Sequence, residues 1–154
     1  MEAGLANLAE RACEATGKDV SGIPGGGAAG GLAAGAAVFM NADLASGADA
    51  VMQAIGLEEA LRGTAWVITG EGKFDHQSLG GKVVSGVARL ARKHGVRVAV
   101  LAGSVQLSED AWRAAGIEAA LGTKPDTMPL EEAMTNAAEL LHTAAVRLAE
   151  EDLS

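Results

Sequence analysis

The spacing of hydrophobic and polar positions changes once along the chain, near residue 63. Before that point, apolar residues recur at the spacing of amphipathic helices, which are predicted at residues 5–16, 28–40 and 49–61. Gly17 ends the first of these helices, and Gly56 breaks the third. No strand is predicted in this part of the chain, so it is expected to be entirely helical.

Beyond residue 63, short apolar runs alternate with amphipathic stretches. The runs predict strands at residues 65–69, 98–102 and 118–121. The amphipathic stretches predict helices at residues 83–94, at 109–115 and from 130 toward the carboxyl end. This β-α-β-α-β-α order is an α/β pattern. It predicts three neighbouring parallel strands with right-handed crossover helices, as part of a doubly wound sheet.

Local signals at the helix ends support these predictions. Gly95 and Gly116 each follow the last residue of a predicted helix, where a left-handed glycine commonly ends the helix. Ser108 stands where an N-cap side chain is needed before the helix at 109–115. The last helix places six apolar residues on one stripe: Leu130, Met134, Ala137, Leu141, Ala145 and Leu148.

The size of the chain allows one domain with a buried core, or one domain and part of another. It has 154 residues, of which 49% are hydrophobic. Three strands make a small sheet, and the helical region before them buries little by itself, so we expect further segments of a longer protein to complete both parts. An unpaired sheet edge and an uncovered helix face would also favour self-association into a homo-oligomer.

Charge and hydropathy exclude several classes of protein. The net charge is −8 and the pI is near 4.8, and Lys and Arg form no cluster for nucleic acid or an anionic membrane. The longest apolar stretch is too short and too rich in Gly and Ala to cross a bilayer. The single cysteine, Cys13, cannot form an intrachain disulfide, and no secretory signal pattern is present. The sequence predicts a soluble protein of the reducing cytoplasm.

A glycine-rich run, IPGGGAAGG at residues 23–31, is the first candidate site. It contains the spacing G-x-G-x-x-G at Gly25, Gly27 and Gly30, which is found in dinucleotide-binding folds. No strand precedes the run, Pro24 interrupts the segment before it, and no acidic residue follows a strand at the usual distance. A dinucleotide site is therefore not expected.

Consecutive glycines before a helix can still direct several backbone N–H groups at one anion. The N-terminus of the helix predicted from residue 28 would add its dipole, so phosphate is the expected ligand. Close helix packing by small residues is the alternative, and it explains the second half of the run better than the first. The candidate phosphate-binding residues of the run are Gly25, Gly26, Gly27, Gly30 and Gly31.

The second candidate site is the polar stretch TGEGKFDHQSLGGK at residues 69–82. Apolar sequence flanks it on both sides, so the polarity is confined to one connection. That connection lies between the carboxyl end of a predicted parallel strand and a helix, where ligands bind in open α/β sheets. Its end, GGK, resembles a Walker A loop. The Walker spacing, however, requires Gly at the place of His76 and Ser or Thr at the place of Val83.

Glu71 and Asp75 are four residues apart in this predicted loop. That spacing would let both carboxylates face one Mg²⁺, or would let one of them act as a base toward a hydroxyl. Gln77, Ser78 and Lys82 offer hydrogen-bond donors to phosphate oxygens. The alternative is a solvated polar turn in which Asp75 caps a helix.

Three ordered blocks of the chain resemble the carboxyl-terminal part of the bacterial glycerate kinase family. The blocks are PGGGAAGG, VITGEGKFDHQSLGGKVVSGVARLA and VAVLAGSV, against the family patterns PGxGAAGG, TGEGxxDxQTxxGKxPxGVA and a strand ending in AGxV. LEEAM at the start of the last helix also matches, so the resemblance covers nearly the whole chain. Ser78 stands where Thr is usual and Val84 where Pro is common, and neither change removes a chemical group.

The resemblance implies a fold of two α/β domains, in which a flavodoxin-like domain is made from both chain ends and a second domain is inserted within it. Residues 1–62 would be the helical part of the inserted domain, with its glycine-rich loop. Residues 63–154 would be the carboxyl-terminal part of the flavodoxin-like domain. The chain would be the last part, less than half, of a usual member, and its partner would be the complementary amino-terminal half of the enzyme.

The same resemblance implies ATP-dependent phosphorylation of D-glycerate with Mg²⁺, giving a phosphoglycerate that is commonly the 2-phosphate. It places the glycine run against phosphate, and Glu71, Asp75, Gln77 and Lys82 along the cleft between the domains. Asp75 is the first candidate for metal or hydroxyl contact, and Glu71 is the second. Two alternatives stay open: a non-catalytic anion-binding or interaction module with the same fold, and an unrelated small-molecule or acyl-phosphate enzyme on the same sheet.

Overall fold

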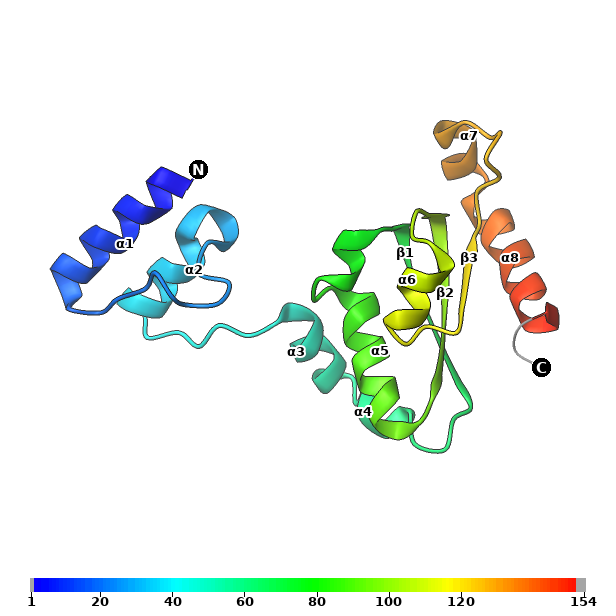
Figure 1. The fold of residues 1–154 in the computed structure, drawn as a ribbon, viewed down its shortest axis with the longest axis horizontal. Coiled ribbons are helices and arrows are strands. Elements are labelled where there is room, and N and C mark those ends of the chain that lie inside the picture. Colours follow the sequence, from blue (N-terminus) through cyan, green and yellow to red (C-terminus); the bar gives the residue numbers. More distant parts are fainter. Residues whose placement is uncertain (1, 152–154) are drawn as a thin grey trace. The chain divides into compact units, whose positions relative to one another are not determined.

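The computed structural model describes residues 2–151, which fall into two compact units (Figure 1). The first unit ends at Ser46 and the second begins at Gly47, and each is described by itself. The domain boundary expected from the sequence, between residues 62 and 63, lies inside the second unit. Residues 47–62 therefore pack with the sheet, while the assignment of either unit to a domain of a longer protein stays a prediction.

The first unit contains two helices, α1 at Glu2–Thr16 and α2 at Ala28–Phe39. Both were expected, although α1 begins earlier than its apolar pattern. Gly17, with a φ of 72°, ends α1 as predicted. The unit has a small buried core formed by Ala12, Val20, Ala34 and Val38.

The start of α2 differs from the expected helix. Ala29, Gly30 and Gly31 have left-handed backbone angles, with φ of 52°, 69° and 97°, so the regular helix begins only after Gly31. A side chain at Gly31 would be strained by the φ of 97° and would have to displace the tip of Leu8 in α1. The helix start expected at residue 28 is thus displaced by a kink at the point where the two helices pack closely.

The second unit is built around a sheet with helices on both faces (Figure 1). Its strands are β1 (Trp66–Phe74), β2 (Arg97–Val105) and β3 (Ala119–Gly122). Its helices are α3 (Gly47–Ala54), α4 (Leu57–Ala60), the short 3₁₀ helix η1 (His76–Leu79), α5 (Val83–His94), α6 (Glu109–Ala114), α7 (Leu130–Thr135) and α8 (Ala137–Glu151).

The three strands are parallel and lie in the order β1-β2-β3, which confirms the predicted sheet. The first strand is longer than predicted, however. It continues from Thr69 to Phe74 and stays paired with β2, so that Glu71 lies opposite Ala102. Glu71 therefore belongs to a strand and not to the loop in which the sequence placed it, because β2 also extends and supplies pairing partners.

Alternate residues of the central strand face two separate cores. Val98, Val100 and Ala102 belong to the larger core, on the face covered by α5 and α6. Ala99 and Leu101 belong to the smaller core on the face covered by α8. This period of two is what a strand buried on both faces requires. The result is a three-layer α/β arrangement.

Local signals placed most helix ends correctly. Gly95 and Gly116 are left-handed and follow α5 and α6, and Gly56 is left-handed between α3 and α4. The Ser108 side chain accepts a hydrogen bond from the backbone N–H of Ala111 and caps α6. Within residues 2–151, no helix combines the length and apolar character needed to cross a bilayer.

The expected last helix is two helices, α7 and α8, which break at Asn136. The break changes the phase of the helical pattern, so the predicted apolar stripe is not one buried face. Leu130 and Met134 of α7 are 68% and 71% exposed. In α8 the predicted stripe is partly right, because Leu148 and Ala145 pack in the core beside the sheet together with Ala144.

Gly70 of β1 is expected to be intolerant of any side chain. A Cβ at this position would collide with the backbone carbonyl oxygen of Leu101 in the neighbouring strand. We expect Gly70→Ala to lower the free energy of unfolding by about 1–3 kcal/mol, because the strands must move apart. Urea denaturation measures the change. Gly72→Ala is the matched control, since a Cβ there meets nothing within 4 Å, and an equal loss in both variants would contradict this explanation.

Candidate functional site

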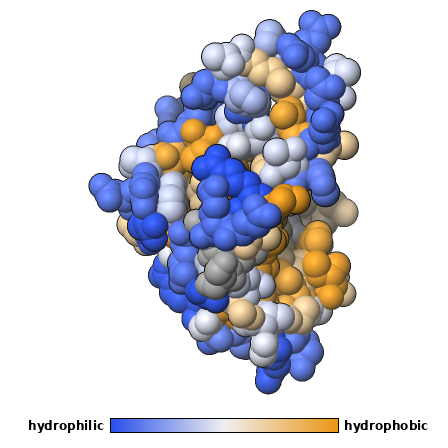
Figure 2. Space-filling view, turned by 90° about the vertical axis from the view of Figure 1, so that its right-hand side faces the viewer, coloured by the Kyte–Doolittle hydropathy of each residue, from blue (hydrophilic) through white to orange (hydrophobic). Residues whose placement is uncertain are grey.

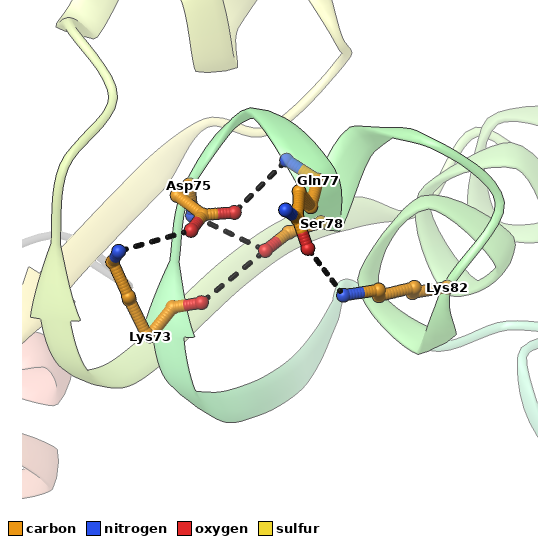
Figure 3. Close-up of polar contacts among 5 residues, drawn as sticks. All are labelled: Lys73, Asp75, Gln77, Ser78 and Lys82. Atoms are coloured by element: carbon orange, nitrogen blue, oxygen red, sulfur yellow. Dashed lines mark hydrogen bonds and ion pairs between the residues drawn. The ribbon is translucent and has the colours of Figure 1, made fainter. Parts of the chain in front are cut away.

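The connection between β1 and α5 is folded around the side chain of Asp75 (Figure 3). Asp75 is the N-cap of η1, and its Oδ1 accepts a hydrogen bond of 2.9 Å from the backbone N–H of Gln77. Its Oδ2 lies 3.3 Å from the Nζ of Lys73, with which it forms an ion pair. Asp75 therefore caps a helix, as the polar-turn alternative predicts from the sequence. This contact fixes the direction of the carboxylate, as a binding or catalytic group requires.

Ser78 completes this cap from inside the loop. Its Oγ accepts from the backbone N–H of Asp75 at 3.2 Å and donates to the carbonyl oxygen of Lys73 at 3.3 Å. The residue is only 1% exposed, so both contacts lie in the protein interior. Ser78 was predicted to donate to phosphate. In this structure its hydroxyl holds the loop together, and a phosphate contact would have to replace the carbonyl of Lys73.

Gln77 and Lys82 form a second contact on the exposed side of the loop. The Nζ of Lys82 lies 3.4 Å from the Oε1 of Gln77 (Figure 3). The backbone of Lys82 is also the N-cap of α5, the positive end of a 12-residue helix. The lysine side chain and the helix end therefore both bring positive charge to this connection, which suits an anionic group.

Lys73 lies within the polar stretch but is not among the site residues predicted from the sequence. The structure shows that it pairs with Asp75 through its ammonium and supports Ser78 through its carbonyl. The sequence offered only a weak signal for this role, a basic residue two positions before Asp75, because residues 70–74 read as a loop and their strand conformation became evident only in the structure.

Asp75 is expected to titrate below its ordinary pKa of 3.8, because the Gln77 N–H donates to it and Lys73 lies beside it. Because this pKa is lower in the folded than in the unfolded state, the ionised carboxylate stabilises the folded state at pH values above the unfolded-state pKa. The stabilisation is lost as the pH falls through the folded-state pKa. Carbon-13 NMR of the carboxyl group measures the pKa. In Lys73→Met it should rise only part of the way, since the Gln77 contact remains. A pKa at or above 3.8 in the unmodified chain would contradict the capped geometry.

Glu71 precedes this loop on β1 and is half-buried. One of its carboxylate oxygens, Oε1, is buried and has no hydrogen-bond partner among the described residues. Buried polar atoms are normally paired, and an unpaired one is costly, so such an atom calls for a functional explanation. A carboxylate in this state is ready to accept a proton or a hydrogen bond from a bound hydroxyl, or to bind a cation.

A magnesium ion is typically held by one or two carboxylates together with phosphate and water oxygens. Glu71 and Asp75 are the two carboxylates that this connection offers, and the unpartnered oxygen of Glu71 fits such a role. Within residues 2–151, no group of three or more His, Cys, Asp and Glu side chains forms a metal-binding cluster.

The glycine-rich run lies in the first unit and is described separately from this loop. Two of its backbone donors are already used in turns, since Gly26 N–H donates to Ile23 and Ala28 N–H donates to Gly25. Gly31 is required for packing against α1, as the packing alternative predicted for the second half of the run. Gly25 is left-handed with a φ of 80° and has open space around its Cα. Phosphate binding by the run stays a prediction.

The fold and the loop define an α/β protein with a polar, charged connection at the carboxyl end of a parallel strand, which is the position of ligand sites in such sheets. The model of the glycerate kinase family matches residues 1–151. The chain belongs to the glycerate kinase family.

Individual relatives agree with this assignment. The glycerate kinase of Halalkalibacterium halodurans is 43% identical over 145 residues, which are 94% of this chain and 37% of the relative. The glycerate 2-kinase of Escherichia coli K12 is 36% identical over 149 residues, or 97% of this chain and 39% of the relative. The chain thus spans less than two fifths of the length of these proteins and corresponds to their carboxyl-terminal portion.

A solved structure also matches. Glycerate kinase 2 from Salmonella typhimurium LT2 superposes with a TM-score of 0.64 at 32% sequence identity. The match covers 95% of this chain and 38% of the Salmonella protein. The observed α/β fold is therefore that of the corresponding part of a glycerate kinase.

Proposed function

We propose that this chain is the carboxyl-terminal part of a glycerate kinase that transfers a phosphoryl group from ATP to a hydroxyl of D-glycerate, commonly giving 2-phosphoglycerate. The observation that carries the proposal is the buried, unpartnered carboxylate oxygen of Glu71, beside a loop that fixes Asp75 with hydrogen bonds and an ion pair. Phosphoryl transfer depends mainly on positioning and charge neutralisation. The two carboxylates would position the hydroxyl and a bound cation, and that cation together with Lys82 would neutralise phosphate charge.

The two carboxylates differ in what they can do. The lowered pKa of Asp75 keeps it ionised, so it is suited to hold a cation or orient a hydroxyl more than to store a proton. Glu71 has a free acceptor oxygen and is the better candidate to receive the proton of the attacking hydroxyl. The hydroxyl oxygen then forms its bond to the γ-phosphorus, the bond to the β-phosphate oxygen breaks, and ADP leaves. Bound Mg²⁺ would neutralise phosphate charge.

Candidate phosphate contacts occur in each unit and are proposed for each unit by itself. Lys82, with Gln77 beside it at the start of α5, would hold phosphate oxygens in the second unit. In the first unit, Gly25 and Gly27 are the candidates of the glycine run for a backbone contact with phosphate, because the N–H of Gly26 already donates to Ile23 and Gly30 and Gly31 shape the kink of α2. The remaining wall of the site would come from the amino-terminal portion that the relatives possess beyond this chain.

The test is reconstitution. This chain would be mixed or co-expressed with the remaining portion of a family member, and ADP formation would be measured with D-glycerate and with no acceptor. We expect ADP formation only from the combination and only with D-glycerate, and phosphorus NMR of the product would distinguish the 2-phosphate from the 3-phosphate. A complex that forms by analytical ultracentrifugation but transfers no phosphate would instead favour a non-catalytic anion-binding or interaction module.

A further inference from the structure

A cavity of about 370 Å³ lies where the carboxyl ends of the strands meet α7 and α8. Strand residues and the segment that follows β3 form one wall, including Gly72, Gly103 and Thr123. Leu130 and Met134 of α7 and Leu140 of α8 form the other. Figure 2 views the side of the molecule that carries these two helices and shows apolar areas among the polar ones. The volume is within the range of small-molecule sites, which are mostly apolar with a few polar groups.

The wall of this cavity is open because residue 72 is a glycine. Two nearby strand positions must be glycine because a side chain does not fit there. A Cβ at Gly70 would collide with the carbonyl oxygen of Leu101, and a Cβ at Gly103 would collide with the carbonyl oxygen of Gly72. A Cβ at Gly72 would meet nothing within 4 Å, and its φ is not in the left-handed region. Glycine weakens a strand interior and occurs where a ligand or another backbone approaches closely, and the open space at Gly72 leaves its backbone accessible from the cavity.

We infer that this cavity binds the adenine base of the nucleotide, an assignment that rests on the proposed kinase function. Its side chains are mainly aliphatic, which suits the faces of a flat heteroaromatic ring and does not suit glycerate, whose carbons all carry oxygen. Ser104 and Thr123 provide hydroxyl groups for the ring nitrogens.

The position of the cavity matches this assignment. Gly72, which lines it, stands directly between Glu71 and Lys73 of the candidate catalytic connection. A base in the cavity would therefore lie next to the strand end from which the charged loop begins. Lys124 fixes the opposite side, because its ammonium donates to the carbonyl oxygens of Pro125 and Met128, both at 3.0 Å, and so holds the segment between β3 and α7.

The binding test uses the isotope-labelled chain, with adenosine as the probe, followed by NMR of the backbone amides. We expect saturable shifts at Gly72, Gly103 and Thr123. Gly72→Val should abolish these shifts while the free energy of unfolding stays equal or rises, because valine suits a strand and the space around a Cβ at this position is open. A purely structural glycine would not separate binding from stability in this way. Shifts that persist in Gly72→Val would overturn the inference.

Met134→Glu provides a second variant at an exposed position. It should weaken adenosine binding by about tenfold or more, since a charge would replace an apolar wall. Val146→Glu is the matched control, because it adds the same charge to another exposed apolar position outside the cavity, and it should leave binding unchanged. Absence of saturable adenosine binding, or displacement of adenosine by D-glycerate, would overturn the inference.

The test separates this inference from the proposed function. If the reconstituted enzyme carrying Met134→Glu phosphorylates glycerate with an unchanged KM for ATP, the base site is wrong and the kinase proposal stands. If adenosine binds in the cavity and Gly72→Val abolishes that binding, while reconstitution gives no phosphoryl transfer, the cavity assignment is supported and the kinase proposal fails.

Discussion

Asp75→Asn is expected to lower kcat by about 10²- to 10⁴-fold in the reconstituted enzyme, with the chain still folded. Asparagine has the same shape and can still accept the hydrogen bond from the backbone of Gln77, so η1 keeps its cap. What it removes is the negative charge that binds a cation or orients the hydroxyl, and that interaction is strongest in the transition state. Loss of the partly exposed ion pair with Lys73 should cost little stability.

Steady-state kinetics and thermal melting of the same preparations measure both effects. Asp110→Asn is the matched control, because Asp110 is an exposed aspartate in the first turn of α6 and should leave kcat unchanged. Lys82→Ala gives a contrasting result. It should raise KM for ATP as well as lower kcat, since a phosphate contact exists before the reaction begins. Near-normal turnover in folded Asp75→Asn would leave the loop as a structural turn.

Local sequence signals were sufficient for most of the sheet unit. Glycine after α5 and α6, serine before α6, and short apolar runs between them predicted the parallel order that the structure shows. The end of β1 could not be predicted in this way, because TGEGKF is polar and glycine-rich, as loops are. Its pairing depends on β2: the carbonyl oxygen of Leu101 requires glycine at position 70, and the carbonyl oxygen of Gly72 requires glycine at position 103. Contacts distant in sequence decided the outcome.

The sequence predicted which residues form the polar connection, but only part of what each side chain does there. The capping contact of Asp75, which the polar-turn alternative predicted, is present, although the short helix η1 that it caps was not predicted. The burial of Ser78 did not follow, because it depends on how η1 packs against the strand. The kink of α2 did not follow either, although the left-handed angles fall on two glycines, Gly30 and Gly31, and on Ala29. The apolar stripe predicted one continuous helix where the structure has two, α7 and α8. The residues around Asn136 include no proline or glycine that would have indicated the break.

Glu71→Met is expected to have opposite effects on stability and on activity. Glu71 presents a buried oxygen without a hydrogen-bond partner among residues 2–151, and a buried acceptor in this state costs about 1–3 kcal/mol. Methionine has a similar length and carries no oxygen, so the free energy of unfolding should rise by about 1 kcal/mol. Turnover in the reconstituted enzyme should fall by about 10²-fold or more, because the proton acceptor or cation ligand is lost.

Urea denaturation and steady-state kinetics of the same variant test the two effects together. Glu118→Met is the control, since Glu118 is exposed and precedes β3 at the opposite end of the sheet from the loop. It should change neither quantity appreciably. A gain in stability with a loss of turnover is typical of a residue kept for function at the expense of folding. A chain destabilised by Glu71→Met would show instead that the carboxylate is satisfied and structural, and the assignment of Glu71 to the catalytic site would then be wrong.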